Sequence, residues 1–330
     1  MGQVMTNSPI ISNCTVDAIR DAALALKDGH LVAFPTETVY GLGADVRNPD
    51  AVKRIYEVKG RPSDHPLIVH VSSINQLEKW AVEIPEYAIK LAHKFWPGPM
   101  TLILKRSEIV GDYITGGQDT VGLRVPSDPI ALALIQEFER ISDSAIAAPS
   151  ANRFGQVSST SSLDVQEELG EYLDDVDRIL DGGDSTIGIE STIIDCSAEY
   201  PVILRSGAVT RFEIVKILGD IVSTRIDNKT KFSGSFDQHY SPKAEIILDL
   251  EPVGKDGYIA IKMIPTPPNI FRLFAPNDVQ EFARGLYSSL RNADNQGIER
   301  IVIAQPEGDG LAEAIRDRLA RAANGRQVIE

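Results

Sequence analysis

The sequence predicts an α/β protein built from two domains. Short apolar runs alternate with segments of helical periodicity, a pattern typical of a twisted mixed or parallel sheet covered by helices. The alternation stops between residues 222 and 243, where polar and small residues follow one another without a period, and it resumes at Glu245. The length of 330 residues also fits two domains of roughly 150 residues each. We therefore expect a first domain at 1–221, a linker at 222–243 and a smaller domain at 244–330.

The first elements of the chain are marked by caps and turns. A helix is expected over 16–28, because its apolar residues share one face and a glycine follows it. A strand at 31–34 then runs into a loop of small and hydroxylated residues. The helix over 48–60 starts with a capping Asn and ends at a Gly, and an apolar strand at 66–71 follows. The apolar face of the first helix consists of Val16, Ile19, Ala23 and Leu26.

The remaining elements continue the alternation. The first domain is completed by helices near 74–80, 88–95, 128–138, 163–173 and 210–218 and by strands at 100–104, 120–125, 145–148, 176–180 and 202–205. The smaller domain has a Rossmann-like alternation, with strands at 246–248, 258–261 and 301–304 and helices over 279–290 and 311–319. No motif within the smaller domain indicates its purpose.

Composition indicates which binding partners and which cellular compartment to expect. The net charge is −14, and nucleic-acid binding depends on Lys and Arg side chains that neutralise phosphates, so we expect direct binding of nucleic acid to be weak or absent. Cys14 and Cys196 are the only cysteines, which favours a reducing compartment. The chain has no run of about 18 apolar residues and no signal-like start. It is expected to be cytoplasmic and to have no membrane partner.

Four cations at the ends of predicted elements indicate a cleft for an anionic ligand. Lys59, Arg61, Arg124 and Arg205 each stand near a glycine or proline turn, where α/β sheets form binding sites. Arginine forks fit phosphate and carboxylate oxygens. The alternative for each cation is an ordinary surface ion pair. No GxxxxGK[ST], GxGxxG, HExxH or GxSxG motif is present. A bound nucleotide must therefore be held by residues other than those of the usual phosphate-binding loops.

Other polar residues allow two interpretations. His70 ends an apolar strand, where a histidine is more often a core residue than a catalyst. Its spacing from His65 does not suit two ligands of one metal. Ser150, Asn152 and Ser158 can bind a ligand, or they can shape a turn and cap a helix. The residues alone leave both interpretations open.

A series of short motifs resembles one known family. PTETVYGLG, KGRP and HPLIVHV are followed in order by WPGPMTLIL, DTVGLRVPSDPIA, AAPSAN, GIESTI, VILRSGAV and HYSP, over roughly residues 15–243. Together they resemble the YrdC-type family. The resemblance implies an L-threonylcarbamoyladenylate synthase of the long form, with a YrdC-like twisted mixed or parallel sheet and a Rossmann-like C-terminal domain.

The resemblance also implies a reaction. L-Threonine, bicarbonate and ATP would give threonylcarbamoyl-AMP, diphosphate and water, through in-line attack of a carbamate oxygen on the α-phosphorus. Such chemistry depends on positioning and on neutralising charge, with Mg²⁺ brought by the ATP phosphates and no organic prosthetic group. The product would pass to the tRNA threonylcarbamoyl transferase machinery. Two other hypotheses stay open: a nucleic-acid-binding module on the same fold, and an ATP-dependent ligase for another amino acid.

Each candidate residue receives a role from the same resemblance. Lys59 and Arg61 would be catalytic and would contact the triphosphate. The ATP site would comprise Lys59, Arg61, His65, Thr120, Ser150, Asn152, Ser158, Arg205 and Tyr240. The L-threonine site would comprise Thr38, His70, Arg124, the backbone at Ala148, and Ser191, and no metal ligand from the protein is implied.

The linker carries one candidate residue and one departure from the family pattern. Tyr240 in HYSP would close over the nucleotide as part of a lid, which would exclude water from a labile anhydride. Residues 234–238 replace a PGMKY-like run that usually precedes this motif, which leaves the geometry of the lid open. A second departure is His65, which stands where many relatives have an asparagine.

Overall fold

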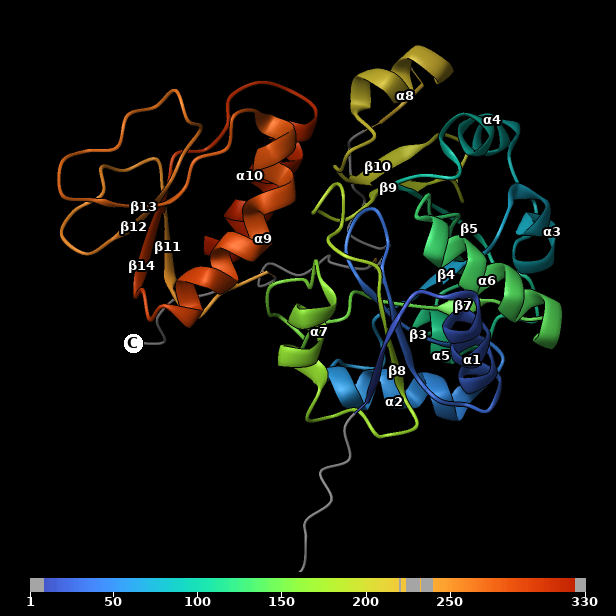
Figure 1. Ribbon diagram of the computed structural model, residues 1–330. Helices are drawn as coiled ribbons and strands as arrows, with labels where there is room; N and C mark the ends of the chain where they lie inside the picture. Colours follow the sequence, from blue (N-terminus) through green and yellow to red (C-terminus); the bar gives the residue numbers. More distant parts are fainter. Residues whose placement is uncertain (1–8, 220, 224–231, 233–239, 324–330) are drawn as a thin grey trace, which may run out of the picture.

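The computed structural model describes residues 9–219, 221–223, 232 and 240–323. It contains a large mixed sheet with helices on both faces and a smaller parallel sheet with two helices (Figure 1). The predicted α/β fold class is therefore confirmed. Most of the expected linker, at 224–231 and 233–239, lies outside the described residues.

The large sheet is built from strands of both directions. In chain order they are β1 (Ile10–Asn13), β2 (Val32–Phe34), β3 (Gly41–Asp45), β4 (Ile68–His70), β5 (Met100–Lys105), β6 (Thr120–Arg124), β7 (Ile146–Ala147), β8 (Arg178–Asp181), β9 (Thr192–Asp195) and β10 (Val202–Arg205). They pair in the order β1-β8-β2-β3-β7-β4-β6-β5-β9-β10. Strands β4 and β6 are parallel, and His70 and Arg124 are register partners at their ends. Register partners lie side by side on one face of a sheet, so the fold brings these two candidate residues together.

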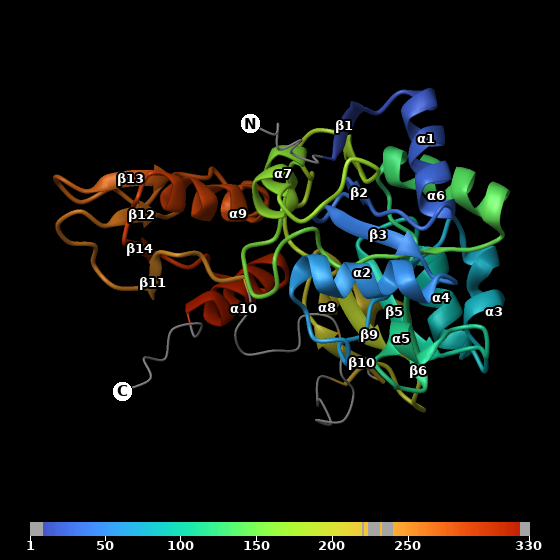
Figure 2. The same cartoon turned by 90° about the horizontal axis from the view of Figure 1, so that it is seen from below.

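Helices cover both faces of this sheet. They are α1 (Val16–Lys27), α2 (Pro49–Lys59), the 3-10 turn η1 (Ile74–Gln76), α3 (Leu77–Trp80), α4 (Glu86–Phe95), α5 (Asp112–Thr115), α6 (Pro129–Ser142), α7 (Ser162–Leu169) and α8 (Arg211–Leu218). Helices α1 and α6 lie side by side (Figures 1 and 2). Their residues Leu26, Leu134 and Phe138 pack with Phe34 and Ile146 of the sheet. A larger apolar cluster on the opposite face includes α2, α3 and α4.

The caps of helix α2 were predicted correctly. Asn48 accepts hydrogen bonds from the backbone N–H groups of Asp50 and Ala51, which satisfies the first turn. Gly60 adopts the left-handed conformation, with φ of 62°, and a Cβ there would lie 2.8 Å from Arg153 Nη2. Glycine at this position thus ends the helix and turns the chain so that Arg61 leaves it in a fixed direction.

Three local expectations are wrong. Val16 is 84% exposed: it is the first residue of α1, whose buried residues lie in its second half. Residues 41–45 were expected in a loop but form the buried strand β3. Its glycines hid the strand signal, and they are needed for close packing, since a Cβ on Gly43 would lie 2.7 Å from Ile146 Cγ2. Strand β1 was not expected at all.

The C-terminal domain is a four-stranded parallel sheet covered by two helices. Its elements are β11 (Glu245–Leu248), β12 (Gly257–Ile259), β13 (Phe271–Phe274), α9 (Val279–Asn295), β14 (Arg300–Ile303) and α10 (Leu311–Ala323), with strand order β11-β14-β12-β13. Strand β13 was missed, but the other elements agree with the sequence pattern. Helices α9 and α10 lie between the small sheet and the first domain (Figure 1).

The two domains share an apolar core. Phe282, Leu286 and Tyr287 of α9 belong to one buried cluster with Val39 and Tyr240, and also with other residues of the first domain. The C-terminal domain is therefore packed against the first domain through its core residues. No helix within the described ranges has the length and apolar character that crossing a membrane requires.

Candidate active site

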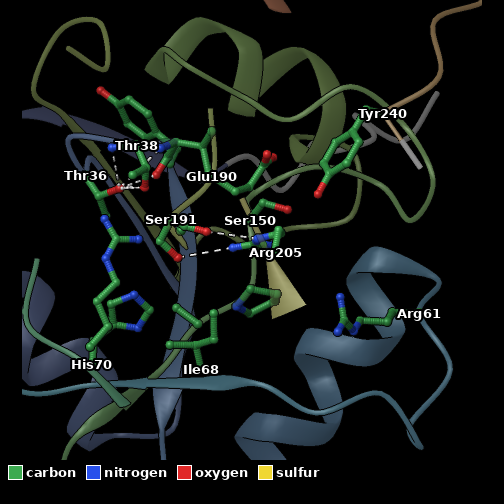
Figure 3. Close-up of a pocket in the computed structure, with 16 residues that line it drawn as sticks. Thr36, Thr38, Arg61, Ile68, His70, Ser150, Glu190, Ser191, Arg205 and Tyr240 are labelled. Carbon is green, nitrogen blue, oxygen red and sulfur yellow. Dashed lines mark hydrogen bonds between the residues drawn. The ribbon is translucent and has the colours of Figure 1, made fainter. Parts of the chain in front are cut away.

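One pocket brings together many of the polar residues selected from the sequence (Figure 3). It lies where β4, β6 and β10 end, beside the loops that follow β2 and β7. In Figure 3, Arg61 and Tyr240 lie on one side and Thr36 and His70 on the other. The lining comprises Thr36, Thr38, Val39, Tyr40, Gly41, Arg61, Ile68, His70, Arg124, Ala148, Pro149, Ser150, Glu190, Ser191, Arg205 and Tyr240.

Arg124 is held at the pocket by a buried carboxylate. Its Nη2 atom lies 2.8 Å from Glu37 Oε1, and both side chains are almost fully buried. The other oxygen of Glu37 accepts a hydrogen bond from Ser127 N at 3.1 Å. The direction of the Arg124 fork is therefore fixed. Glu37 was not among the residues selected from the sequence, although a carboxylate between two threonines next to a buried strand is a usable signal for a buried ion pair.

His70 is a neutral histidine. Burial, together with the nearby charge of Arg124, lowers the pKa of its imidazole to about 3. The ring stands edge-on to Phe34, with the ring centroids 5.9 Å apart. Its Nδ1 atom has no hydrogen-bond partner among the described residues. A neutral imidazole has one donor and one acceptor nitrogen, so this side chain offers a buried polar atom to a ligand.

Neutral burial of His70 makes stability depend on pH. The pKa is lower in the folded than in the unfolded chain, so the unfolded chain binds more protons between about pH 6.5 and pH 3, and stability falls as the pH drops through that window. Between pH 6.5 and pH 5 the wild type should lose about 1.6 kcal/mol more of unfolding free energy than His70→Gln. Denaturant titration at both pH values measures this difference. The exposed His93, changed to Gln, serves as control, and equal losses in wild type and His70→Gln would contradict the expectation.

Thr38 and Ala148 lie in the same part of the pocket as His70. Thr36 Oγ1 donates to Val39 O at 2.6 Å, so it accepts in its 2.8 Å contact with Thr38 Oγ1. Thr38 is therefore oriented by its neighbour. Ala148 N donates to Ile68 O at 2.9 Å, so its N–H group is already used by the sheet.

Arg205 and Ser191 form a second fixed pair. Arg205 Nε donates to Ser191 O at 3.0 Å, and its Nη2 donates to Ser191 Oγ at 3.1 Å. Ser191 Oγ also contacts Thr101 Oγ1 at 2.8 Å. The close approach of the two segments requires Gly207, where a Cβ would lie 2.4 Å from Thr192 N. The guanidinium group is therefore directed into the pocket by backbone geometry.

Arg61 supplies the third cation of the pocket. It follows directly after Gly60, and its Nη2 donates to Pro66 O at 3.0 Å. Burial lowers its pKa to about 10, so it still carries its charge near neutral pH. Arg61, Arg124 and Arg205 thus bring three positive charges to one enclosed site.

Lys59 does not line the pocket but lies behind it. Its Nζ donates to Ser150 O at 2.6 Å and to Asn152 O, and burial strongly lowers its pKa. Asn152 does not line the pocket either: its Nδ2 donates to Arg153 O at 2.7 Å and to Gln156 O at 2.9 Å, and its Oδ1 is buried without a hydrogen-bond partner among the described residues. Both residues fix the loop that presents the side chain of Ser150.

Three further candidates lie outside the pocket lining. His65 is buried with its ring against Phe154. Ser158 donates to Glu190 Oε1 at 2.6 Å. Thr120 lines a small neighbouring cavity, which shares Ile68 with the main pocket.

Glu190 lines the pocket and was not selected from the sequence. It belongs to the GIESTI segment, where it lies between Ile189 and Ser191 just before a buried strand, and it is 6% exposed. Such a residue needs a cation as partner. The sequence contains this signal but does not show which arginine supplies the charge.

Comparisons with known proteins agree with this fold. Residues 24–207 match the Sua5, YciO and YrdC family model, described as telomere recombination, and residues 209–324 match the threonylcarbamoyl-AMP synthase C-terminal domain. Threonylcarbamoyl-AMP synthase of Pyrococcus abyssi is 41% identical in an alignment of 341 positions, and the match covers 94% of this chain and 95% of that protein. That of Bacillus subtilis is 37% identical over 348 residues, with coverage of 99% and 96%.

A solved structure is similar over nearly the whole chain. The crystal structure of P. abyssi Sua5 complexed with L-threonine gives a TM-score of 0.86 at 41% identity, and the match covers 96% of this chain and 98% of that one. The resemblance inferred from the motifs is confirmed. The chain therefore belongs to the threonylcarbamoyl-AMP synthase enzyme family, in the form that joins a YrdC domain to a Sua5 C-terminal domain.

Proposed function

We propose that this protein forms threonylcarbamoyl-AMP from L-threonine, bicarbonate and ATP in the pocket of Figure 3. The observation that carries the proposal is the meeting of Arg61, Arg124 and Arg205 in one buried pocket. Several cations in an enclosed site suit a reaction that joins a carboxylate-bearing substrate to a triphosphate. The full-length relative from P. abyssi, whose structure holds L-threonine, supports the choice of amino acid.

The proposed threonine subsite is the side of the pocket that contains His70. Arg124, fixed by Glu37, would bind the substrate carboxylate through its planar fork. Neutral His70 and oriented Thr38 would bind the amino and hydroxyl groups. Ser191 and the backbone at Ala148 would complete the subsite.

The proposed ATP subsite is the side that contains Arg61 and Tyr240. Arg61, Arg205 and Ser150 would contact the phosphates directly. Tyr240 would cover the nucleotide. The remaining proposed ATP residues lie behind the pocket or beside it and would act on the nucleotide through the loops that they hold: Lys59, His65, Thr120, Asn152 and Ser158.

The proposed chemistry needs no covalent intermediate on the protein. Bicarbonate supplies CO₂, with loss of water, and the threonine amine adds to it to give a carbamate. A carbamate oxygen then bonds to the α-phosphorus while the bond to the bridging oxygen breaks and diphosphate leaves. Arg61 and Arg205 would stabilise the charge on the phosphate oxygens.

A magnesium ion would enter this pocket with ATP. No group of three or more His, Cys, Asp or Glu side chains in the described part of the chain is placed to hold a metal ion. The ATP phosphates would therefore supply most of the ligands, and the ion would neutralise part of their charge.

Domain boundaries, cellular location and the fate of the product belong to the same proposal. Residues 1–221 would carry the catalysis, 222–243 would close over it, and 244–330 would form the C-terminal domain. The protein would act in the cytoplasm and pass its product to the tRNA threonylcarbamoyl transferase machinery, with little or no direct contact to tRNA because its net charge is −14.

The function is tested by the dependence of diphosphate release on both co-substrates. The purified chain should release diphosphate from ATP only when L-threonine and bicarbonate are present together, and threonylcarbamoyl-AMP should appear in equal amount. Omission of either compound should reduce the rate to background. Release that continues in bicarbonate-free buffer would refute the proposed reaction.

Selectivity among amino acids tests the threonine subsite. Serine lacks one methyl group, so its kcat/KM should fall roughly 10- to 100-fold. Valine keeps the shape but leaves the partner of the threonine hydroxyl unpaired, so its loss should be larger than that of serine. Diphosphate release with each amino acid gives the three values. Equal use of valine and threonine would contradict the subsite.

A further inference from the structure

Two side chains of the C-terminal domain reach the wall of the pocket. Arg318 of α10 and Tyr287 of α9 are almost fully buried. Both donate to Glu190 Oε2, Arg318 through Nε at 2.8 Å and Tyr287 through its hydroxyl at 2.9 Å. The other oxygen of Glu190 accepts from Ser158 at 2.6 Å. Since Glu190 lines the pocket beside Ser191, the C-terminal domain is connected to the site by direct hydrogen bonds.

These contacts decide the charge of Glu190. Burial opposes its ionisation, but the charges of Arg318 and Arg205 and the hydrogen bond from Ser158 lower its pKa to about 2. A buried carboxylate is costly when its partner is removed. Arg318 Nη2 also donates to Ser206 O at 2.9 Å, directly after Arg205 in the chain. Arg318 thus contacts Glu190, the neighbour of Ser191, and Ser206, the neighbour of Arg205. Ser191 is in turn the hydrogen-bond partner of the Arg205 guanidinium.

The same two residues hold Tyr240. The ring of Tyr240 stacks on Tyr287, with centroids 5.7 Å apart and an interplanar angle of 21°, and the Arg318 guanidinium lies 5.5 Å from its centroid. Tyr240 has φ of 67°, a conformation that a bulky residue keeps only when its surroundings enforce it. The next residue is also fixed, because Ser241 N donates to Gly155 O at 3.0 Å. The place of Tyr240 is therefore set by its contacts with α9 and α10 together with the hydrogen bond of Ser241 to Gly155.

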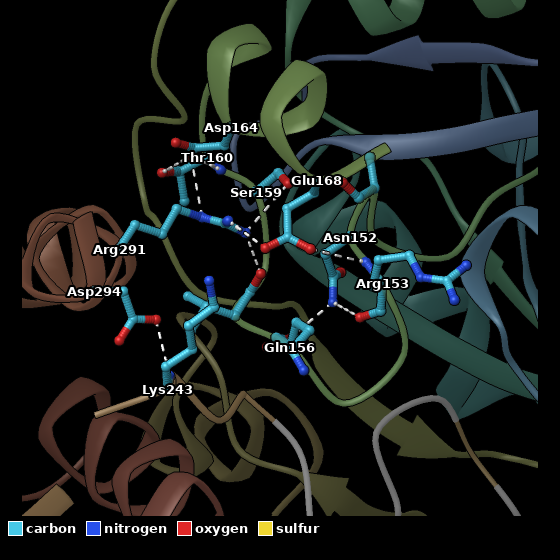
Figure 4. A network of polar contacts seen from close by, with 12 residues as sticks. Asn152, Arg153, Gln156, Ser159, Thr160, Asp164, Glu168, Lys243, Arg291 and Asp294 are labelled. Carbon is cyan, nitrogen blue, oxygen red and sulfur yellow. Dashed lines mark hydrogen bonds and ion pairs between the residues drawn. The ribbon is translucent and has the colours of Figure 1, made fainter. Parts of the chain in front are cut away.

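A separate bridge fastens the two domains to each other. Arg291 of α9 lies 2.8 Å from Glu168 Oε1 and also donates to Val157 O. Asp294 of the same helix accepts a hydrogen bond from the backbone N–H of Lys243, in the segment that leads into the C-terminal domain (Figure 4). None of these residues lines the pocket. The C-terminal domain is thus held to the first domain by contacts away from the pocket. Arg318 and Tyr287, in contrast, contact residues of the pocket wall.

We propose that Arg318 and Tyr287 are positioning residues of the ATP subsite, which act through Glu190 and Tyr240. This inference rests on the proposed function, because it names residues that order the same pocket. It also assigns the C-terminal domain a role in substrate binding. No motif in the sequence of that domain indicated such a role.

The affinity of the full-length chain for a non-hydrolysable ATP analogue tests the proposal. Arg318→Met should raise the Kd at least tenfold by calorimetric titration, and Arg318→Lys should restore part of the affinity. Arg316→Met is the matched control: it lies on the same helix and donates to Pro306 O and Gly308 O within its own domain, at 2.7 and 2.8 Å. The control should change the melting temperature without changing the Kd by more than twofold.

A double-mutant cycle tests the route through Glu190. The effects of Arg318→Met and Glu190→Gln on the Kd should be clearly less than multiplicative when combined. In turnover, Arg318→Met should raise the KM for ATP more than it lowers kcat. If Arg318→Met does not fold, Tyr287→Phe keeps the stacked ring and removes only the hydroxyl, and it should raise the Kd two- to fivefold.

The outcomes separate this inference from the proposed function. Analogue binding needs no turnover. A wild-type chain that binds the analogue but releases no diphosphate would refute the proposed reaction, and the Kd values of the variants would still test the positioning role of Arg318 and Tyr287. A folded Arg318→Met variant with wild-type affinity overturns the inference, as does an equal loss of affinity in Arg316→Met. A folded Tyr287→Phe variant with unchanged Kd overturns the part assigned to Tyr287.

Discussion

Arg61→Ala should lower the rate of diphosphate release by two to three decades and leave the fold intact. The side chain is buried beside the pocket and fixed by Gly60 and by Pro66 O. Loss of one preorganised charge contact in a water-poor site costs on the order of 2 to 4 kcal/mol in the transition state. Burial lowers the pKa of this arginine to about 10, so the ligand-free fold disfavours its charge, which should offset the hydrogen bond to Pro66 O that is lost with the side chain and leave stability close to that of the wild type.

Steady-state kinetics and thermal unfolding measure the two halves of this expectation. Arg61→Lys should be intermediate, because it keeps the charge and loses the fork. The exposed Arg140 pairs with Glu137 on α6, and Arg140→Ala serves as control, with wild-type rate and stability. An Arg61→Ala variant of wild-type activity would exclude Arg61 from the phosphate subsite. A markedly lower melting temperature would contradict only the expectation that removal of this buried charge leaves the stability of the fold unchanged.

Arg124→Met should lower both stability and threonine use. Without the guanidinium, Glu37 stays buried as an uncompensated carboxylate, which costs roughly 3 to 5 kcal/mol of unfolding free energy. The lost charged hydrogen bonds to the substrate should lower kcat/KM for threonine by roughly 10- to 100-fold, as expected for about 1.5 to 3 kcal/mol. Denaturant unfolding and initial-rate kinetics at varied threonine give the two numbers.

The double variant Glu37→Gln with Arg124→Met separates these effects. It removes both buried charges, so most of the stability should return. Threonine use should remain as low as in Arg124→Met, because the fork is still absent. Recovery of activity together with stability would mean that Arg124 serves the fold and does not bind the substrate.

Much of this site could be predicted because its elements carry local signals. Asn48 and Gly60 mark the ends of α2 through their own backbone preferences, and these preferences place Arg61 after the turn. His70 and Arg124 each end an apolar strand, and neighbouring parallel strands bring such ends together. In these cases the residue and its near neighbours in the sequence are enough to predict where the side chain lies in the fold.

The partners of these residues could not be predicted in the same way. Glu190 is paired with Arg318, which follows it by 128 residues, and Glu37 with Arg124, which follows it by 87. Only the assembled fold decides which buried cation meets which carboxylate. For the same reason the sequence did not place Lys59 behind the pocket, since its direction depends on the carbonyl groups of Ser150 and Asn152.

The apolar core shared by the two domains also limits how the sequence can vary. Val39 and Tyr240 belong both to the pocket wall and to the cluster that contains Phe282 and Leu286 of α9. Interiors at close-packed density transmit a change of volume to their neighbours. Substitutions on a helix that never meets a substrate can thus reshape the cavity in which the substrates react. We therefore expect substitutions in α9 to affect catalysis through the shared core, and an exchanged C-terminal domain to require a matching set of core residues in the first domain.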